Sequence, residues 1–425
     1  MMKHLRLLQK VLLILFLAIG TLASCASEKE LRIGVISDIH FLSEHLMDNG
    51  SAISSLSESA GRDFTAIPFI LDKVLSDYLH SDIDILLISG DMTKDGEKQS
   101  HIDLVKKLQP LRDKGIRIYV VPGNHDINMP YASLYKGETV QKAENVDPVE
   151  FEQIYADCGY SKALYKDTAS LSYVTELSNN IWLVAIDGCR YKEYTNNSIS
   201  GGKINEHTEM WLRSMFLEAK RKNKLVLGMM HHALVEHFPY QEMLFSQYII
   251  DDWKHYADLF ADSGMKAIFT GHFHANDITE YISGEQNKIY DIETGSLTSY
   301  AFPYRFVTIR DSGMDVETRN VEALQNKPDL VEHSKKRLEA IAGQLALGKL
   351  KSLGVDVNDS IANQIARIAG GIFVLHAAGD EVVTDSLKQQ IKELGRLFDQ
   401  TTPEDDIDDF KIDFFPADNN VKINF

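Results

Sequence analysis

The sequence has few cysteines and fewer basic than acidic residues. Its 425 residues include three cysteines, Cys25, Cys158 and Cys189, and none lies in a spacing typical of a metal site. Lysine and arginine total 44 against 62 acidic residues, which gives a formal net charge of −18. No basic cluster is present to contact phosphates, so we do not expect a nucleic-acid polymer as a partner. Cys158 and Cys189 either form a disulfide or remain free thiols, and the sequence leaves both alternatives open.

The chain lacks a long hydrophobic run near its N-terminus. Its apolar stretch 11–19 is shorter than the about 20 residues that span a membrane. Basic residues precede or flank this stretch, and Leu-Ala-Ser-Cys follows at 22–25, which predicts a signal peptide over 1–24. The sequence Leu-Ala-Ser-Cys at 22–25 resembles a bacterial lipobox that ends at Cys25. This resemblance predicts an extracytoplasmic lipoprotein anchored to the bacterial cell membrane; a plain signal peptide or an uncleaved anchor is the alternative.

Five short polar motifs each follow an apolar run that reads as a buried strand. The runs are LRIGVIS, DILLIS, IRIYVVP, KLVLGMM and MKAIFT. Because ligands bind at the carboxyl ends of strands in α/β sheets, we expect the motifs to meet at one edge of one sheet. Their Asp, His and Asn side chains then predict a metal site. The motifs are Asp38-Ile39-His40, Gly90-Asp91, Gly123-Asn124-His125-Asp126, His231-His232 and Gly271-His272-Phe273-His274.

The spacing of apolar residues predicts an α/β fold followed by a helical segment. Residues 41–63 lack periodicity and are expected to form a loop over the first motif. Apolar residues then recur at three- and four-residue intervals over 67–79, and a second helix is expected over 98–114. This βαβαβ order predicts parallel strands. We expect a catalytic domain over 30–322 and a helical C-terminal domain over 326–425.

The ordered motifs resemble those of the calcineurin-like metallophosphoesterases, over about residues 32–275. Within that superfamily the chain is most similar to the bacterial cyclic-nucleotide phosphodiesterase branch, including members with a helical C-terminal domain. The resemblance implies a four-layer αββα sandwich that holds two divalent metal ions. It also implies the ligands: Asp38, His40, Asp91 and His274 for one ion, and Asp91, Asn124, His231 and His272 for the other, with Asp91 bridging.

The same residue types have a chemical reason to hold two metals. Two divalent ions about 3.5–4 Å apart need a bridging carboxylate, and they lower the pKa of a shared water so that it attacks as hydroxide. Mixed Asp, Asn and His ligands suit Mn, Fe or Zn. By the resemblance, His125 is not a ligand, and we expect it to contact the phosphoryl oxygen or the leaving group. Asp126 either orients His125 or serves as a turn carboxylate, and both remain open.

Two departures from related families narrow the expected reaction. Purple acid phosphatases place a metal-binding tyrosine three residues after the second-motif aspartate, where this chain has Lys94. Protein Ser/Thr phosphatases carry Asp-Arg-Gly after that motif, whereas here the residues are Lys94-Asp95-Gly96. We therefore expect a phosphodiesterase that hydrolyses a small phosphate ester, cyclic nucleotides first, by in-line attack of a hydroxide bound to two metals. A phosphomonoesterase, or a non-catalytic surface binding lipoprotein, is the alternative. The physiological substrate, the metals, the oligomeric state and the role of the helical domain stay open.

Overall fold

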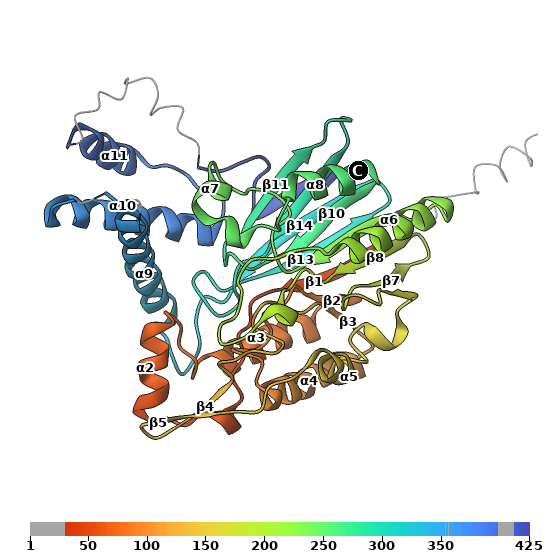
Figure 1. The fold of residues 1–425 in the computed structure, drawn as a ribbon, viewed down its shortest axis with the longest axis horizontal. Helices are drawn as coiled ribbons and strands as arrows, with labels where there is room; N and C mark the ends of the chain where they lie inside the picture. The colour runs from red at the N-terminus through yellow and green to blue at the C-terminus, as the bar shows by residue number, and fades with distance from the viewer. Residues whose placement is uncertain (1–29, 353, 356, 398–411) are drawn as a thin grey trace, which may run out of the picture.

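A computed structural model describes residues 30–352, 354–355, 357–397 and 412–425. The predicted signal peptide 1–24 and Cys25 lie outside the described residues. Two β-sheets form the centre of the molecule, with helices on both outer sides (Figure 1). This arrangement confirms the predicted four-layer αββα sandwich.

The first sheet has six strands in the order β15-β14-β13-β1-β2-β3. Its parallel part is formed by the strands that precede the first three motifs, which confirms the predicted βαβαβ unit. The remaining strands pair antiparallel. The bounds are β1 Leu31–Ile36, β2 Ile85–Ile88, β3 Arg117–Val120, β13 Pro303–Arg310, β14 Gly313–Asn320 and β15 Asn420–Asn424.

The second sheet has seven strands in the order β11-β12-β10-β9-β8-β7-β6. Parallel pairing joins β8, β9, β10 and β12, and the last two motifs follow β9 and β10. The bounds are β6 Tyr165–Lys166, β7 Tyr173–Ser178, β8 Ile181–Ile186, β9 Leu225–Met230, β10 Met265–Thr270, β11 Asp277–Ile282 and β12 Lys288–Glu293.

Amphipathic helices cover the outer face of each sheet. Helices α3 (Ile67–His80) and α4 (Lys98–Asp113) lie on the six-stranded sheet, and α6 (Glu206–Arg221) and α8 (Trp253–Asp262) lie on the other (Figure 1). The apolar positions of α3 are buried, and the hydroxyl of Tyr78 donates to the carbonyls of Val35 and Arg305. The shorter elements are α5 Pro148–Ile154, α7 Gln241–Phe245, β4 Ser133–Lys136 and β5 Thr139–Lys142.

The structure corrects three expectations. The five motifs do not share one sheet, because three follow strands of the six-stranded sheet and two follow strands of the seven-stranded sheet. All five strands are buried on both faces, so their sequences carry no signal of sheet membership. The expected loop 41–63 contains helix α2 (Ser51–Ser59). The segment 326–425, expected to be helical, ends in β15, which pairs with the open edge of β14.

Three helices follow the sandwich. They are α9 (Leu330–Ser352), α10 (Asp359–Ala378) and α11 (Asp385–Leu397), and they project from one side of the two sheets (Figure 1). Helix α9 packs along α10, and α2 lies below α9 in Figure 1. By length and composition alone α10 would suffice to cross a membrane, but the core helices of soluble proteins pass the same test.

Candidate metal centre

The structure brings the predicted ligands together where strands of both sheets end. Asp38, His40, Asp91 and His274 each offer one donor atom, and these atoms lie within 4.8 Å of one another. Asp91, His231 and His272 form a second such group. The side-chain oxygen of Asn124 lies 3.1 Å from Nε2 of His231 and so joins the second group. Asp91 is common to both groups, as the bridging position requires.

Several of these residues have a backbone conformation that non-glycine residues rarely adopt. Asp38, His40, Asp91, His272 and His274 have φ between 44° and 79°. Each left-handed residue costs on the order of 1–3 kcal/mol unless its surroundings hold it in place. Such outliers cluster at functional sites, and here they turn five donor side chains toward one point.

Gly123 lets the third motif approach Asp91 closely. A Cβ atom on Gly123 would lie 2.1 Å from the backbone nitrogen of Asp91 and 2.2 Å from its Oδ1. The backbone of Asp91 could move away from such a Cβ atom only by distorting the chain, so this position accepts only glycine. The glycine thereby fixes the distance between the bridging carboxylate and the Asn124–His125 pair.

The orientation of the donor atoms fits a cation between them. Nδ1 of His231 donates to the carbonyl of Ser89 at 2.8 Å, so Nε2 is the ring nitrogen turned toward the centre. That Nε2 faces Oδ1 of Asp91 at 3.4 Å and the Asn124 oxygen at 3.1 Å. Oδ1 of Asp38 is buried and accepts no hydrogen bond. Burial lowers the pKa of His231, but Asp91 and Asp38 outweigh it and raise the pKa to about 9. A divalent cation bound by the same atoms would replace that proton as the positive charge that these buried acceptors need.

The centre is accessible at His125 and His274, which mark its open side. The side chains of His125 and His274 are 35% and 30% exposed, whereas those of Asp38, His40 and Asp91 are at most 5% exposed. A substrate therefore reaches the donor atoms past His125 and His274.

His125 is held by Asp95, a residue that the sequence analysis did not select. Its Nδ1 lies 2.9 Å from Oδ1 of Asp95 and 2.9 Å from the carbonyl of Lys94, so Nε2 is left free toward the open side. Burial lowers the pKa of His125, but the carboxylates of Asp91 and Asp95 outweigh it and raise the pKa to about 9. In the sequence, Asp95 lies in the turn just after the second motif, and this position could have marked it as a residue near the metal site.

Asp126 serves as a turn carboxylate, one of the two roles that the sequence left open. Its carboxylate accepts hydrogen bonds from the backbone N–H groups of Met92, Thr93 and Gly123. It therefore ties the second and third motifs together as a turn carboxylate and does not contact the ring of His125. Burial and the nearby Asp91 raise its pKa to about 6.

The two adjacent histidines of the fourth motif diverge. His231 belongs to the second donor group, whereas Nε2 of His232 lies 2.9 Å from the carbonyl of Ser200. His232 belongs to neither group of donor atoms. The structure thus places His231, and not His232, among the donor atoms of the centre.

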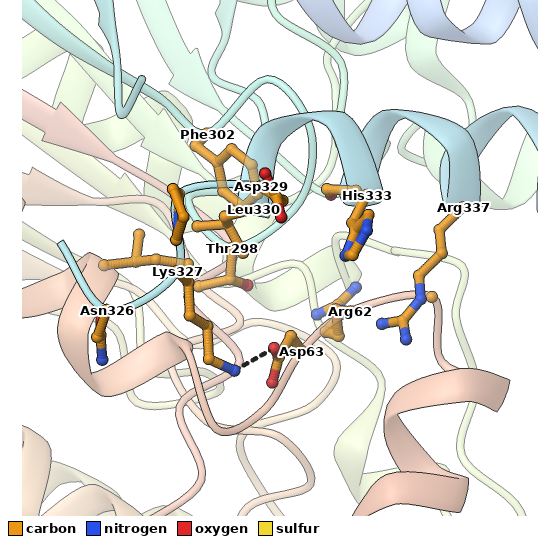
Figure 2. Close-up of a pocket in the computed structure, with 14 residues that line it drawn as sticks. Arg62, Asp63, Thr298, Phe302, Asn326, Lys327, Asp329, Leu330, His333 and Arg337 are labelled. Carbon is orange, nitrogen blue, oxygen red and sulfur yellow. Dashed lines mark hydrogen bonds and ion pairs between the residues drawn. The ribbon is translucent and has the colours of Figure 1, made fainter. Parts of the chain in front are cut away.

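Arg62 lies beside the open side and was also missed. Its Nη2 atom is 3.5 Å from Nδ1 of His274, and its Nε is buried without a hydrogen-bond partner. Arg62 is the single arginine or lysine within 41–63, the segment expected to lie over the first motif, and this could have marked it as a residue that contacts an anionic substrate. It lines a cavity of about 330 Å³ between this segment and α9, where Figure 2 shows its side chain close to those of His333 and Arg337. Lys327 and Asp63, which line the same cavity, form an ion pair.

Cys158 and Cys189, for which the sequence allowed either a disulfide or free thiols, are free thiols in the structure. Cys158 is buried in the core, and the thiol of Cys189 donates to the carbonyl of Pro122 at 3.2 Å.

Comparison with known proteins defines the class. Residues 31–276, more than half of the chain, match the family model described as calcineurin-like phosphoesterase, and the chain belongs to this family of metal-dependent phosphoester hydrolases. A probable cyclic nucleotide phosphodiesterase from Vesicomyosocius okutanii subsp. Calyptogena okutanii (strain HA) is 41% identical over 56 residues. That match covers 13% of this chain and 23% of the relative, so this chain spans less than a quarter of it.

Two solved structures that the chain matches have low sequence identity and TM-scores below 0.5. A dimetal phosphatase from Danio rerio is 11% identical with a TM-score of 0.48, and the match covers 68% of this chain and 96% of that one. The purple acid phosphatase PPD1 from yellow lupin (Lupinus luteus) is 14% identical with a TM-score of 0.45, covering 69% and 52% of the two chains.

Proposed function

We propose that this protein is a phosphodiesterase that hydrolyses a small phosphodiester, with cyclic nucleotides as the first substrate class. One observation carries the proposal: two groups of donor atoms share the buried Asp91, and a free imidazole nitrogen of His125 lies on their open side. Membership of the phosphoesterase family and the short match to a probable cyclic nucleotide phosphodiesterase support it.

The roles of the donor residues follow from their chemistry. Two divalent cations, when bound by these groups, would stabilise negative charge on the phosphoryl oxygens and acidify the attacking water. Mn, Fe and Zn suit the mixture of carboxylate, amide and imidazole donors. Asp91 would screen the repulsion between the two cations because its oxygens face both groups. The assignment of the seven ligands, Asp38, His40, Asp91, Asn124, His231, His272 and His274, is part of the proposal.

His125 and Arg62 would act on the substrate itself. In its protonated form, His125 can donate from Nε2 to the oxygen of the leaving group, while Asp95 holds the other ring nitrogen. Arg62 provides a guanidinium that is always charged and can bind a phosphoryl oxygen in a fork geometry. The adjacent cavity, lined by Arg62 and the first turns of α9, would receive the second substituent of the diester.

The proposed location is extracytoplasmic. We propose that Cys25 carries lipid and that the catalytic domain stands outside the membrane on the short polar segment after it. Mass spectrometry of the protein from a bacterial membrane fraction tests this: a diacylated peptide beginning at Cys25 is expected, and an N-terminal peptide that includes residues before 25 would contradict it.

The test of the reaction is a substrate panel. Chelator-treated protein is reloaded with Mn, Fe or Zn and is assayed on 2′,3′- and 3′,5′-cyclic nucleotides, glycerophosphodiesters, a bis-aryl phosphate and a mono-aryl phosphate. We expect higher kcat/KM on the diesters, and a loss of turnover in Asn124→Ala and His231→Ala. Faster hydrolysis of the monoester would show a phosphomonoesterase, and near-normal activity in both variants would defeat the ligand assignment.

A further inference from the structure

A second cluster of metal-binding residues lies apart from the catalytic centre. Asp277 begins β11, His376 lies near the end of α10, and Glu381 follows that helix. One donor atom from each of the three lies within 4.8 Å of the others. The residues are 0%, 6% and 8% exposed, so water does not solvate them. The cluster joins the seven-stranded sheet to the C-terminal helices.

A fourth carboxylate approaches from the segment that leads to β15. Asp413 forms a group with Asp277, Glu381 and Asp418 on the same distance criterion. The oxygens of Asp418 already accept hydrogen bonds from the backbone N–H groups of Ile278 and Asp380, at 2.9 and 2.5 Å. Asp413 is therefore the more available fourth ligand.

The cluster contains buried acceptor atoms without partners. Oδ2 of Asp277, Oε2 of Glu381 and Oδ1 of Asp413 are all inaccessible to solvent and accept no hydrogen bond. A buried carboxylate oxygen without a donor costs on the order of 1–3 kcal/mol or more. Three such atoms from three separate segments point to a cation that binds them together.

The basic side chains at the cluster do not reach all of its carboxylate oxygens. Nδ1 of His376 contacts Oε1 of Glu381 and lies 3.7 Å from Oδ2 of Asp277. Glu293 lies directly opposite Asp277 across β11 and β12 and is fully buried; its oxygens accept no hydrogen bond, and Oε2 lies 3.5 Å from Nε2 of His237. Arg305 donates to the carbonyls of Asp418, Asp277 and Glu293 and not to their carboxylates. His237 contacts the other oxygen of Asp277, Oδ1, at 2.6 Å.

Among the described residues, acids outnumber bases around this point. The carboxylates are Asp277, Asp291, Glu293, Asp380, Glu381, Asp413 and Asp418, and the facing basic side chains are His237, His376 and Arg305. The carboxylate of Asp291 accepts hydrogen bonds from the backbone N–H groups of Leu234 and Val235 and from the hydroxyl of Thr270. Carboxylate oxygens without hydrogen bonds therefore remain on the side of the cluster that faces Glu381 and Asp413.

We propose that Asp277, His376, Glu381 and Asp413 bind one structural divalent cation, in addition to the two of the catalytic centre. Three carboxylates and one imidazole suit Mn²⁺ or Zn²⁺ better than Ca²⁺, which takes oxygen ligands alone. The cation connects β11, the end of α10 and the returning C-terminal segment. Because His376 packs against Phe273 of the fifth motif, with ring centroids 5.4 Å apart, it also fixes the C-terminal helices beside the open side of the catalytic centre.

Metal analysis of the full-length protein tests the proposal. After exhaustive chelation, reloading with Mn²⁺ and gel filtration, we expect three ions per chain in the unchanged protein. Glu381→Gln and Asp413→Asn should each bind two. Glu285→Gln serves as the matched control, because this exposed acid lies in the turn between β11 and β12 and should keep three.

A variant of the catalytic centre separates this proposal from the proposed function. Asp91→Asn should lose ions of the catalytic centre yet keep one ion, and its melting temperature should rise with Mn²⁺ concentration. Adding Glu381→Gln to Asp91→Asn should remove that remaining ion and the Mn²⁺ dependence. The proposal is overturned if Asp91→Asn binds no ion, or if Glu381→Gln and Asp413→Asn both bind as many ions as the unchanged protein. In that case protons alone would neutralise the cluster.

Discussion

The Nε2 atoms of His40 and His274 lie 3.2 Å apart, although 234 residues separate them in the chain. His40 follows a strand of the six-stranded sheet, and His274 follows a strand of the seven-stranded sheet. Oδ1 of Asp38 lies 3.1 Å from the same nitrogen of His274. The candidate metal centre is therefore built across the junction of the two sheets, and a shift of one sheet against the other would separate its donors.

The adjacent histidines of the fourth motif give a matched pair of variants. His231→Gln should lose about one bound metal ion per chain and lower kcat/KM by at least about 100-fold, because it removes a donor atom of the centre. His232→Gln should keep its metal content and kcat within about threefold, and should lose about 1–2 kcal/mol of stability with the bond to Ser200. Metal analysis and steady-state kinetics compare the two. Equal metal loss in both variants would contradict the assignment.

Asp95 should matter for the leaving group and not for metal binding. Asp95→Asn removes the charge that holds His125, and we expect kcat to fall about 10- to 100-fold with unchanged metal content. The loss should be larger for an alkyl leaving group than for a nitrophenyl group, which departs without a proton. Asp126→Asn is the control, because it should lower stability through its backbone bonds and show no such dependence. The same loss for both leaving groups in Asp95→Asn would argue against proton donation by His125.

Arg62 should contribute to substrate binding through its charge. Arg62→Gln should raise KM and lower kcat/KM for anionic diesters by about 10-fold or more, since a charged hydrogen bond is worth about 1.5–3 kcal/mol. Arg337→Gln changes the same cavity at a residue for which the structure shows no contact with His274, and it should have a smaller effect. Arg62→Lys should recover part of the loss. An unchanged kcat/KM in Arg62→Gln would show that substrate does not contact this arginine.

His101 should make the protein sensitive to acid. Its ring is fully buried between Tyr155 and the carbonyl of Asp126, and burial lowers its pKa to about 4. Between its ordinary pKa of about 6.5 and this value, the unfolded chain takes up a proton that the folded protein does not. The free energy of unfolding should therefore fall as the pH drops from 6.5 to 4, by up to about 3 kcal/mol.

Urea unfolding at several pH values measures this slope. His101→Gln should flatten the fall in stability between pH 6.5 and 4, while His207→Gln, at an exposed position, should follow the unchanged protein. A slope in His101→Gln as steep as in the unchanged protein would assign the acid sensitivity to other groups.

The order of the motifs was readable from the sequence because it depends on local patterns. Apolar runs of strand length, each ended by Asp, Asn or His, identify strands and their carboxyl ends without knowledge of the partners. The helices between them fix parallel pairing, because a crossover of that length returns the chain in the same direction. These features predicted the parallel βαβαβ unit and the side chains that the structure gathers around Asp91, whereas the class and the sandwich were implied by the resemblance of the ordered motifs to a known family.

The division into two sheets was decided by tertiary packing. Strands buried on both faces look alike in sequence, so nothing local shows that β9 and β10 belong to a different sheet from β1, β2 and β3. The same holds for Arg62 and Asp95, which are ordinary loop residues until folding places them beside His274 and His125.

The sequence by itself determined which residues follow the strands, and so the kind of chemistry that this protein carries. Tertiary structure alone decided which residues surround that chemistry. It also brought Asp277 and Glu381 next to His376 on one side and Asp413 on the other, from three distant segments. The physical reason is that a strand end is encoded by neighbours along the chain. A charge cluster between a sheet and a helix end depends on how separate elements pack.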